Sequence, residues 1–550
     1  MTNSSCDTEA ADVVVVGTGA PGLTAAILAH DNGAKVVLVE RTDKVGGASA
    51  VSGGGLWVPL NNHLDEVGAS DSRDEALAYC KALSMGRVED LVIETFIDTA
   101  AAMVTYLEKQ TPLKFRATSA PDYQTETIGA KLGGRTIEPV PFELGELGAS
   151  RERLRSPSSL AFPVTLQEVY NEFQAFYQPW KIPSDLLVDR MTRGIVCLGQ
   201  ALVAPLFKAV EERGIPILLN TRVRKLQRDG ERITGVVAER DGTPLSLSAN
   251  AGVILATGGF EWNEALKRRF LSYPITHPNS PPYGEGDGLV MAMEVGADLA
   301  NMAEVWNYPS IAVPGETYDD RPLSRGVKAE RSGPHVIWVN KRGQRFVNEA
   351  ANYNSIGKAF ASPETAEPGY RNLPAWAILD SQYREKYVLG TSMPDDPLPA
   401  WVKRGDSLAE LARLVDVDPQ GLEETVERWN SFCARGMDRD FGRGDSAFDR
   451  YQGDHQAPHP NLGTIDKPPF FAFPIVTGAL GTKGGPRTNE NAQVVNVRGE
   501  AIEGLYAVGN VAASLSGPSY FGAGSTLGPG MTWGYIAGIH AAKRAQERNW

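Results

Sequence analysis

The hydrophobic pattern is most pronounced near the N-terminus, where four consecutive valines, residues 13–16, follow Ala11 and Asp12. A strand that is apolar on both faces is typical of a buried parallel sheet, so this run predicts a central parallel strand. A glycine-rich turn follows, and then residues 23–30 are predicted to form a helix. A second apolar run, Lys35–Val39, ends at Glu40. The order strand, turn, helix, strand predicts an α/β fold.

Later apolar runs extend this pattern to the end of the chain. Residues 232–238 and 251–260 predict two more strands, and residues 72–109 predict a helical stretch. Residues 504–510 predict a strand that stops in a glycine turn, before a helix over residues 531–548. The last part of the chain is therefore expected to return to the first fold unit.

The middle of the chain has elements of its own. We predict a strand over 334–340 with a turn at 341–343, and helices over 407–415 and 418–435. Asp418 is the expected cap of the second helix, because Pro419 suits the first helical position. The Pro- and Gly-rich run 454–469 would carry the chain back to the first unit. Residues 111–185, rich in Pro, Gly and Ser, are either loops over a substrate entrance or an irregular surface insertion.

The first turn carries a dinucleotide-binding signature, Gly17-Thr18-Gly19-Ala20-Pro21-Gly22, with Glu40 after the next strand. Glycines let a pyrophosphate approach backbone N–H groups at the positive end of a helix, and the acid can accept the ribose hydroxyls. A glycine turn of another doubly wound protein is the plainer interpretation. Strand, helix and acid at the proper spacing favour a dinucleotide.

A second glycine-rich segment follows Glu40. It favours FAD over NAD, because the larger FAD molecule needs a second stretch of backbone to cover it. Glycines and small hydroxyls let the backbone lie against a diphosphate and a flavin ring, although a flexible surface loop is the alternative. The expected FAD contacts are Gly17, Gly19, Ala20, Pro21, Gly22, Glu40, Arg41, Gly46, Gly47, Ala48, Ser49, Ser52, Gly53, Gly54, Val223, Ala256, Thr257, Gly258, Asp287, Gly509, Asn510, Ser525, Thr526 and Leu527.

Composition narrows the function classes. With 550 residues, 42% of them hydrophobic, the chain can form two or more domains, and its net charge of −13 opposes nucleic-acid binding. Residues 1–12 lack the features of a secretory signal, and no apolar run approaches the about 18 residues of a membrane span. The four cysteines, Cys6, Cys80, Cys197 and Cys433, have no metal-ligand spacing and suggest no disulfide framework. We therefore expect a cytoplasmic protein without a bound metal.

The order of these pieces resembles the FAD-binding fold of fumarate reductase and succinate dehydrogenase flavoproteins and their ketosteroid dehydrogenase relatives. Residues 339–349, Val-Asn-Lys-Arg-Gly-Gln-Arg-Phe-Val-Asn-Glu, look like the hallmark of that superfamily, and the resemblance covers nearly the whole chain. It implies a Rossmann-like FAD-binding domain, discontinuous in sequence over 1–310 and 483–550, with an inserted α+β catalytic (cap) domain over 311–482. Arg345 beside Asn348 and Glu349 offers a charge-assisted network next to the flavin, or only a surface ion pair.

Two positions separate the branches of the superfamily. Fumarate reductases have a proton-delivering arginine shortly after this motif, whereas residues 350–354 here are Ala-Ala-Asn-Tyr-Asn. They also have a histidine before Thr-x-Gly-Gly, where this chain has Gly481. A dicarboxylate site without its cations would leave buried carboxylates unpaired, so fumarate reduction is disfavoured. Residues 41–60 contain no histidine for covalent attachment, so the FAD is expected to be noncovalent.

Residues 519–528, Ser-Tyr-Phe-Gly-Ala-Gly-Ser-Thr-Leu-Gly, are similar to the tyrosine and glycine segment of 3-ketosteroid Δ1-dehydrogenases. That resemblance implies that Tyr353 is the proton-abstracting base and that Tyr520 and Gly524 bind the carbonyl. It also implies that Tyr123, the weakest match, supports the base. With 17 tyrosines in the chain, ordinary packing is the alternative for each one.

These residue types suit removal of two hydrogens next to a ketone, because the flavin accepts hydride while a base takes the alpha proton. The reference pKa of tyrosine is about 10, so a neighbouring hydroxyl must help Tyr353 to ionise. A phenol O–H and a backbone N–H would stabilise the developing enolate as an oxyanion hole does. His277 and His335 are expected to be structural, Lys483 to face solvent, and position 522 to tune the choice of ring.

We therefore expect a dehydrogenase that introduces a C=C bond next to a ring ketone, most simply ring A of a 3-ketosteroid. The expected partners are a small hydrophobic ketone and an electron acceptor. Alternatives are a 3-ketosteroid Δ4-(5α)-dehydrogenase and a dehydrogenase of a smaller ring such as a cyclohexanone. Further alternatives are an enoate reductase of the fumarate reductase type and a noncatalytic flavoprotein.

Overall fold

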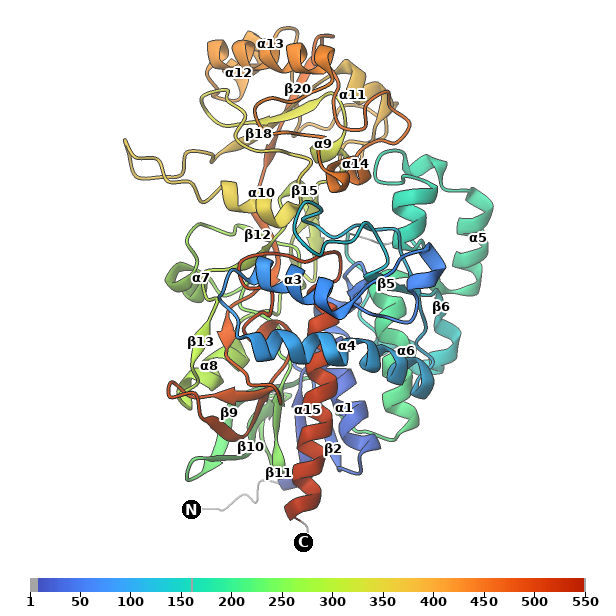
Figure 1. Ribbon diagram of the computed structural model, residues 1–550, viewed down its shortest axis with the longest axis vertical. Helices are drawn as coiled ribbons and strands as arrows, with labels where there is room; N and C mark the ends of the chain where they lie inside the picture. The colour runs from blue at the N-terminus through green and yellow to red at the C-terminus, as the bar shows by residue number, and fades with distance from the viewer. Residues whose placement is uncertain (1–7, 160–161, 549–550) are drawn as a thin grey trace.

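The computed structural model describes residues 8–159 and 162–548, and Cys6 lies outside this part of the chain. Figure 1 shows an elongated molecule with a large sheet at the bottom, a small sheet at the top and loop-rich segments between them. The fold is mixed α/β, as the hydrophobic pattern predicts.

The large sheet contains the valine run at its centre. Its strand order is β23-β24-β11-β1-β2-β8, and β10 pairs with β11 and β9 with β10, both in antiparallel fashion. Strands β1, β2, β8, β11 and β24 run parallel, and Val13, Val14 and Val15 are completely buried. The bounds are β1 (Thr8–Val16), β2 (Val36–Val39), β8 (Ile217–Leu218), β9 (Thr221–Asp229), β10 (Arg232–Arg240), β11 (Thr243–Leu255), β23 (Gln493–Val495) and β24 (Ala501–Ala507). Strands from both ends of the chain therefore share one sheet.

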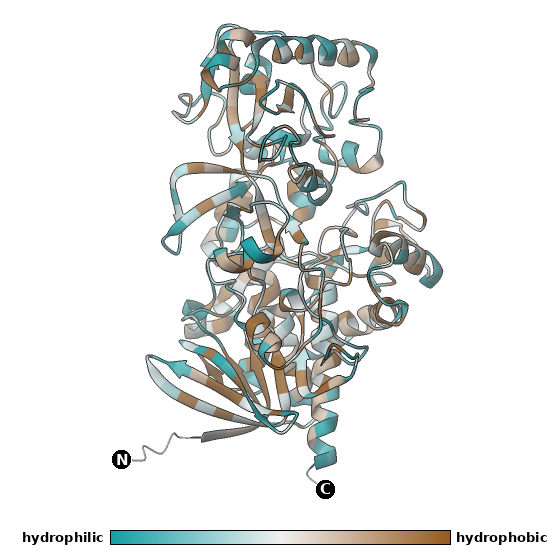
Figure 2. Ribbon diagram, turned by 90° about the vertical axis from the view of Figure 1, so that its left-hand side faces the viewer, coloured by the Kyte–Doolittle hydropathy of each residue, from teal (hydrophilic) through white to brown (hydrophobic). Residues whose placement is uncertain are grey.

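Two helices from opposite ends of the chain pack together beside this sheet, α1 (Ala20–Asp31) and α15 (Leu527–Arg548). A Cβ atom on Gly538 would come within 2.5 Å of the Ala25 carbonyl oxygen, so the close approach of the two helices depends on glycine. The strands of the large sheet are the apolar, brown part of the lower molecule in Figure 2, whereas the end of α15 is hydrophilic. Helices α4 (Asp90–Gln110) and α6 (Leu198–Glu212) add to the same core.

The small sheet is antiparallel, in the order β17-β18-β20-β19. Its strands are β17 (Val336–Val339), β18 (Ala375–Asp380), β19 (Lys403–Gly405) and β20 (Phe470–Ile475). Helices α12 (Leu408–Leu414) and α13 (Pro419–Arg435) lie over it at the top of Figure 1. As predicted, Asp418 caps α13, since its carboxylate accepts from the Gly421 N–H at 3.3 Å.

The segment between the sheets consists of short elements and the hairpin β15 (Ser310–Tyr318) and β16 (Arg321–Gly326). Strands β12 (His277–Pro278), β14 (Val305–Asn307) and β21 (Gly478–Thr482) form a three-stranded sheet here. The short helix α10 (Tyr353–Ala359) follows the 339–349 motif. These elements position the residues described below.

Several predicted boundaries are wrong in detail. The helical stretch 72–109 is two helices, α3 (Arg73–Ser84) and α4, because Met85 and Gly86 adopt left-handed backbone angles that end α3. Helix α1 begins at Ala20 rather than at residue 23, and α15 begins at Leu527 rather than at residue 531. Residues 454–469 do not return the chain to the large sheet, because they lead into β20 of the small sheet.

Candidate active site

One cavity of about 560 Å³ connects the glycine turns of the large sheet with residues below the small sheet. The first turn and the second glycine-rich segment line one part, while residues from β16, α10 and α14 (Ala447–Gln452) line another. Residues 162–182 add an apolar wall that includes Val164, Tyr170 and Phe176. The region 111–185 therefore contributes to the cavity instead of being a surface insertion alone.

Most of the predicted cofactor residues line this cavity. They are Gly17, Gly19, Pro21, Glu40, Arg41, Gly47, Ala48, Ser49, Ser52, Gly53, Gly54, Val223, Ala256, Thr257, Gly258, Asp287, Gly509, Asn510, Thr526 and Leu527. The Glu40 carboxylate is buried and accepts from the Thr18 hydroxyl at 2.6 Å and the Thr42 N–H at 3.0 Å. Asp287 pairs with Arg222 at 2.6 Å.

Four predicted cofactor residues lie behind the cavity wall. Ala20 donates its N–H to the Ser49 hydroxyl at 3.0 Å, and Gly22 packs against the Gly17 carbonyl. Gly46 packs against Ala50 and Val203, and the Ser525 hydroxyl bonds to the backbone of Gly522. These four residues support the backbone that lines the cavity but do not face the cavity themselves. Spacing along the sequence does not tell which residues of a motif face a ligand.

The structure brings three of the predicted catalytic side chains into one aromatic cluster. The Tyr123 hydroxyl donates to the Tyr353 hydroxyl at 2.6 Å, and the rings of Tyr123 and Tyr520 lie 5.0 Å apart. Tyr353 meets Tyr520 edge-on, with ring centroids 5.4 Å apart. These tyrosines come from three widely separated parts of the sequence, and all of them line the cavity.

Gly524 completes the group of predicted residues. Its φ of +93° suits glycine, and a Cβ atom would come within 2.5 Å of the Gly55 carbonyl oxygen. Within the described part of the chain its N–H has no hydrogen-bond acceptor, and the residue lines the same cavity as Tyr520. A phenol hydroxyl and a free backbone N–H are therefore available on one side of the cavity.

Burial strongly affects the tyrosine hydroxyls. It raises the pKa of Tyr353 and Tyr123 well above that of an exposed tyrosine, and it also raises the pKa of Tyr520. The guanidinium of Arg331, which is fully buried, partly opposes this rise in the pKa of Tyr123. The cluster is therefore protonated at neutral pH in the absence of a ligand.

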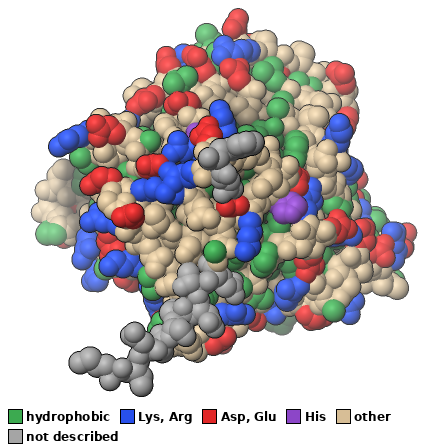
Figure 3. Space-filling model, turned by 90° about the horizontal axis from the view of Figure 1, so that it is seen from below, with side chains coloured by type: hydrophobic (Ala, Val, Ile, Leu, Met, Phe, Trp, Pro, Cys, Tyr) green, Lys and Arg blue, Asp and Glu red, His purple; other side chains and the backbone are tan. Residues whose placement is uncertain are grey.

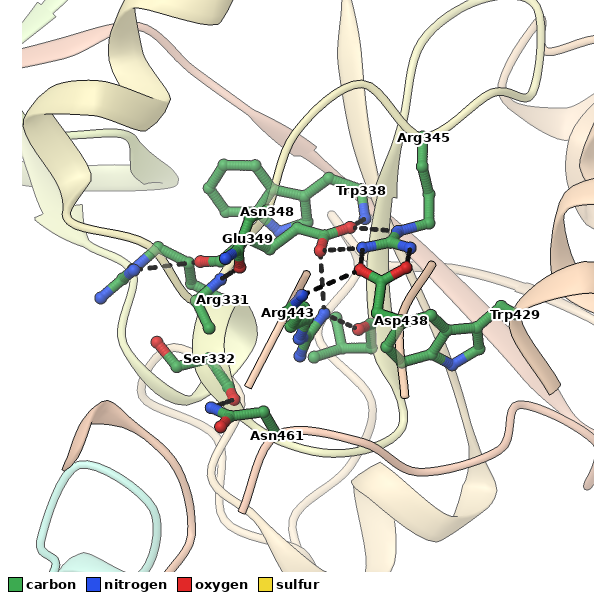
Figure 4. A network of polar contacts seen from close by, with 12 residues as sticks. Arg331, Ser332, Trp338, Arg345, Asn348, Glu349, Trp429, Asp438, Arg443 and Asn461 are labelled. Atoms are coloured by element: carbon green, nitrogen blue, oxygen red, sulfur yellow. Dashed lines mark hydrogen bonds and ion pairs between the residues drawn. The ribbon is translucent and has the colours of Figure 1, made fainter. Parts of the chain in front are cut away.

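The 339–349 motif forms a buried charge network beside the cavity rather than a surface ion pair (Figure 4). Glu349 accepts from Arg345 at 2.8 Å and from Arg443 at 3.1 Å, and Asp438 also accepts from Arg345. Burial disfavours the ionised form of Glu349, but Arg345 and Arg443 hold its pKa below the ordinary value. Two carboxylates thus balance two guanidinium groups.

This network is linked to Tyr353 through the backbone. Arg331 donates to the carbonyl oxygens of Glu349 and Ala351, directly before α10. The side chain of Asn352 caps α10 by accepting from the Ser355 N–H at 3.0 Å. The motif therefore holds the segment that carries Tyr353, and it does not line the cavity itself.

The residues of the glycine-rich part fit FAD. At Gly47 and Gly258 a Cβ atom would meet no other atom within 4 Å, which leaves room for a ligand against the backbone. The Thr257 hydroxyl is buried in the cavity wall without a partner among the described residues. Together with a buried acid after β2, on a parallel sheet, these features define a dinucleotide-binding site.

Comparison with known proteins identifies the family. A family model described as an FAD binding domain matches residues 12–527. A 4-oxocyclohexanecarboxylate 2-dehydrogenase from Sinomonas cyclohexanicum is 39% identical, over 97% of this chain and 93% of its own length. A 3-oxosteroid 1-dehydrogenase from Mycolicibacterium smegmatis is 36% identical, over 97% of both chains. The crystal structure of 3-ketosteroid Δ1-dehydrogenase from Sterolibacterium denitrificans, in complex with 1,4-androstadiene-3,17-dione, matches with a TM-score of 0.92 at 38% identity, over 98% of this chain and 100% of that one.

The chain therefore belongs to the FAD-binding flavoprotein family that includes the 3-ketosteroid Δ1-dehydrogenases, and FAD is its cofactor. The resemblance drawn from the 339–349 and 519–528 motifs is confirmed.

Sequence reasoning missed two buried lysines. Lys483 was expected to face solvent, but it is completely buried. Its ammonium lies 4.2 Å from the Trp306 ring and donates to the Gly517 and Ser519 carbonyls. Lys328 lines the cavity, with its ammonium 5.8 Å from the Tyr353 ring. Isolated lysines carry no motif, so only the tertiary structure reveals them.

Other expectations on single residues have mixed outcomes. His277 and His335 do not line the cavity, and His335 bonds to the Thr464 carbonyl oxygen at 2.7 Å. Gly522 does not line it either, because a Cβ atom there would come within 2.6 Å of the Trp57 ring. Substitution at 522 would therefore disturb packing before it could alter a contact with a ligand.

Two surface features bear on partners. Acidic and basic side chains are intermixed on the lower face of the molecule, without a large patch of one sign (Figure 3). Across residues 8–159 and 162–548, the helices lack the length and apolarity that crossing a bilayer requires.

Proposed function

We propose that this protein is an FAD-dependent dehydrogenase that introduces a C=C bond next to the carbonyl of a ring ketone, with 3-ketosteroid Δ1-dehydrogenation as the reference reaction. The observation that carries the proposal is the cluster of Tyr123, Tyr353 and Tyr520 in the same cavity as the glycine-rich cradle. The activities named for relatives at 36% and 39% identity support it.

The chain's own residues take complementary roles in this proposal. The Tyr520 hydroxyl and the Gly524 N–H donate to the ketone oxygen and stabilise the enolate that develops there. Tyr353 takes the proton from the carbon alpha to the carbonyl. Tyr123, whose hydroxyl oxygen lies 2.6 Å from that of Tyr353, donates to the phenolate form. Bound FAD supplies the acceptor for the second hydrogen and its electron pair.

The pKa of Tyr353 imposes a condition on this chemistry. Because burial raises that pKa, the phenolate needs a stabilising neighbour, and the Tyr123 hydroxyl, whose oxygen lies 2.6 Å away, can donate to it. Tyr353 must therefore release its phenol proton to solvent before it can take the alpha proton, and alkaline pH favours that ionisation. The rate of flavin reduction should rise with pH.

A smaller ring ketone is the second candidate substrate class, and the relative named 4-oxocyclohexanecarboxylate 2-dehydrogenase favours it. Dehydrogenation at the Δ4 position of a 5α-steroid uses similar groups and is a further alternative. An enoate reductase of the fumarate reductase type is less compatible with the site, since Gly481 and residues 350–354 supply no cationic side chain.

We extend the proposal to the organisation of the chain. Residues 1–310 and 483–550 form a Rossmann-like FAD-binding domain, and residues 311–482 form an inserted α+β cap domain. The sharing of one sheet by β1, β11 and β24 supports this division. A separate electron acceptor reoxidises the flavin, and the cysteine pattern supports a cytoplasmic location.

The test is Tyr353→Phe, followed by anaerobic reduction of the flavin with a 4-ene-3-ketosteroid, a 5α-saturated analogue and cyclohexanone. We expect the variant to keep its flavin absorbance but to lose reduction by about 10²- to 10⁴-fold, the usual contribution of a general base. Product identification distinguishes Δ1 from Δ4 dehydrogenation. Full activity in the variant would place the base elsewhere.

A further inference from the structure

The ammonium of Lys328 is a buried cation in the wall of the cavity. This lysine comes just after β16, lines the cavity and is 9% exposed. Three aromatic rings surround the ammonium, those of Tyr170 at 4.6 Å, Phe176 at 5.1 Å and Tyr353 at 5.8 Å. It is therefore close to the residue proposed as the base.

No carboxylate in the described part of the chain neutralises this ammonium. Its hydrogen-bond partners are the Tyr170 hydroxyl and the Gln452 side-chain oxygen, the latter at 3.4 Å. Glu330 is nearby, but its carboxylate accepts from the backbone N–H groups of Gly390 and Lys328 instead. Arg331 is a second cation, and burial together with its repulsion lowers the pKa of Lys328.

The other cations of the cavity wall already have acidic partners. Arg155 pairs with Asp319 at 2.7 Å, Arg325 pairs with Glu316 at 2.7 Å, and Arg222 pairs with Asp287 at 2.6 Å. A buried charge without a counter-ion is unfavourable, and an anionic ligand group would complete the pair. Lys328 is thus the cavity cation with capacity for an anionic ligand group.

We infer that Lys328 binds a carboxylate carried by the ring-ketone substrate. This inference rests on the proposed function and specifies its substrate class. In the proposed function, Tyr520 and Gly524 hold the ketone oxygen and Tyr353 takes the proton from the neighbouring alpha carbon. Because the ammonium lies beside the Tyr353 ring, the carboxylate belongs on the reacting ring or one bond from it, as in a 4-oxocyclohexanecarboxylate. A carboxylate at the far end of a steroid would lie too far from this ammonium.

The experiment compares matched substrates with the FAD-loaded enzyme under anaerobic conditions. The panel is 4-oxocyclohexanecarboxylate, its methyl ester, a neutral 3-ketosteroid and a 3-ketosteroid with a carboxylated side chain. For wild type we expect the small acid to have a KM about 10- to 100-fold below that of its ester, the range for a hydrogen bond between charged groups. The two steroids should not differ by that factor.

Lys328→Met should remove this preference. The KM and the dissociation constant of the small acid should rise about 10- to 100-fold, while both values for the ester stay within about twofold of wild type. Lys328→Arg should restore part of the preference. Arg325→Met is the matched control, because it removes a cavity cation that Glu316 already neutralises, and the ratio of acid to ester should not change.

Binding by calorimetry separates the two proposals. Acid binding that depends on Lys328 without flavin reduction by any ketone would support the carboxylate site and overturn the proposed function. Flavin reduction by ring ketones with equal KM values for acid and ester would overturn the carboxylate site alone. Equal losses for acid and ester in Lys328→Met would also overturn it, since the lysine would then act through Tyr353.

Discussion

Two neighbouring groups of buried cations in this protein differ in how their charge is balanced. Around the 339–349 motif, Arg345 and Arg443 share Glu349 and Asp438, with N–O distances of 2.8 to 3.1 Å. Lys328, which lines the cavity, and its neighbour Arg331 have carbonyl, amide and hydroxyl partners but no carboxylate within ion-pair distance in the described part of the chain. Both groups are buried, so the difference does not come from exposure.

We interpret the paired cations around the 339–349 motif as structural and the cation without a carboxylate in the cavity wall as functional. A network with matched charges is complete without a ligand, and it fixes the side chain of Glu349, four residues before Tyr353. Cations without counter-ions raise the energy of the unliganded protein, and their charge becomes favourable when a carboxylate binds beside them. Functional sites commonly retain such unfavourable features at the expense of stability.

The largest expected effect comes from unbalancing the structural network with Glu349→Gln. This change keeps the shape of the side chain but leaves two guanidinium groups with a single carboxylate. We expect a loss of about 3–5 kcal/mol in the free energy of unfolding, as for the removal of one partner of a buried ion pair. The urea midpoint of the FAD-loaded protein measures it.

The control for this variant is Asp416→Asn, which removes the partner of Lys341 from an exposed pair 3.5 Å apart, in which Asp416 is 91% exposed. Its urea midpoint should match that of wild type. Equal midpoints for Glu349→Gln and wild type would contradict the structural role of the network.

The second largest effect is expected for Tyr123→Phe, and it concerns the rate of catalysis. Loss of the 2.6 Å hydrogen bond removes a donor that can stabilise the Tyr353 phenolate, so the phenolate should form less readily during the reaction. We expect flavin reduction at neutral pH to slow by about 10- to 100-fold, the range for a hydrogen bond to a charged group. The rising limb of the pH profile should move to higher pH by about 1–2 units.

Tyr308→Phe is the matched control, since the Tyr308 ring meets the Tyr353 ring edge-on at 4.7 Å but its hydroxyl makes no hydrogen bond to Tyr353. Its pH profile should stay in place. An unchanged profile for Tyr123→Phe would exclude the supporting role of Tyr123.

The smallest expected effect has the opposite sign. Lys328→Met removes a buried ammonium that lacks a counter-ion and places an apolar side chain of similar length among aromatic rings. The substrate-free protein should therefore gain about 1 kcal/mol of stability. Differential scanning calorimetry of the FAD-loaded protein measures the shift, and a marked destabilisation would mean that Lys328 belongs to the structural class instead.

The sequence alone predicted much of the fold, for reasons that are local. The valine run could not expose a face to water, so its place as a central parallel strand followed from composition. Asp418 and Pro419 predicted the start of α13 because capping depends on adjacent residues. The break between α3 and α4 was missed, although Gly86 marks it, because both helices continue the same apolar pattern.

The sequence also predicted one part of the candidate site and not another. The motif residues Tyr353, Tyr520 and Gly524 were identified because they lie in recognisable segments, and most of the glycine-rich positions line the cavity. Ala20, Gly22, Gly46 and Ser525 do not line it, because facing a ligand depends on how segments far apart in sequence pack together.

By itself, the sequence determined the buried parallel strand, the glycine turn that opens a helix and the motifs of an FAD-binding family. Each of these depends on neighbouring residues. The tertiary structure decided which charges are matched and which are not. It brought Glu349 to Arg443 and left Lys328 without an acid, because the balance of a buried charge depends on side chains that only folding brings together.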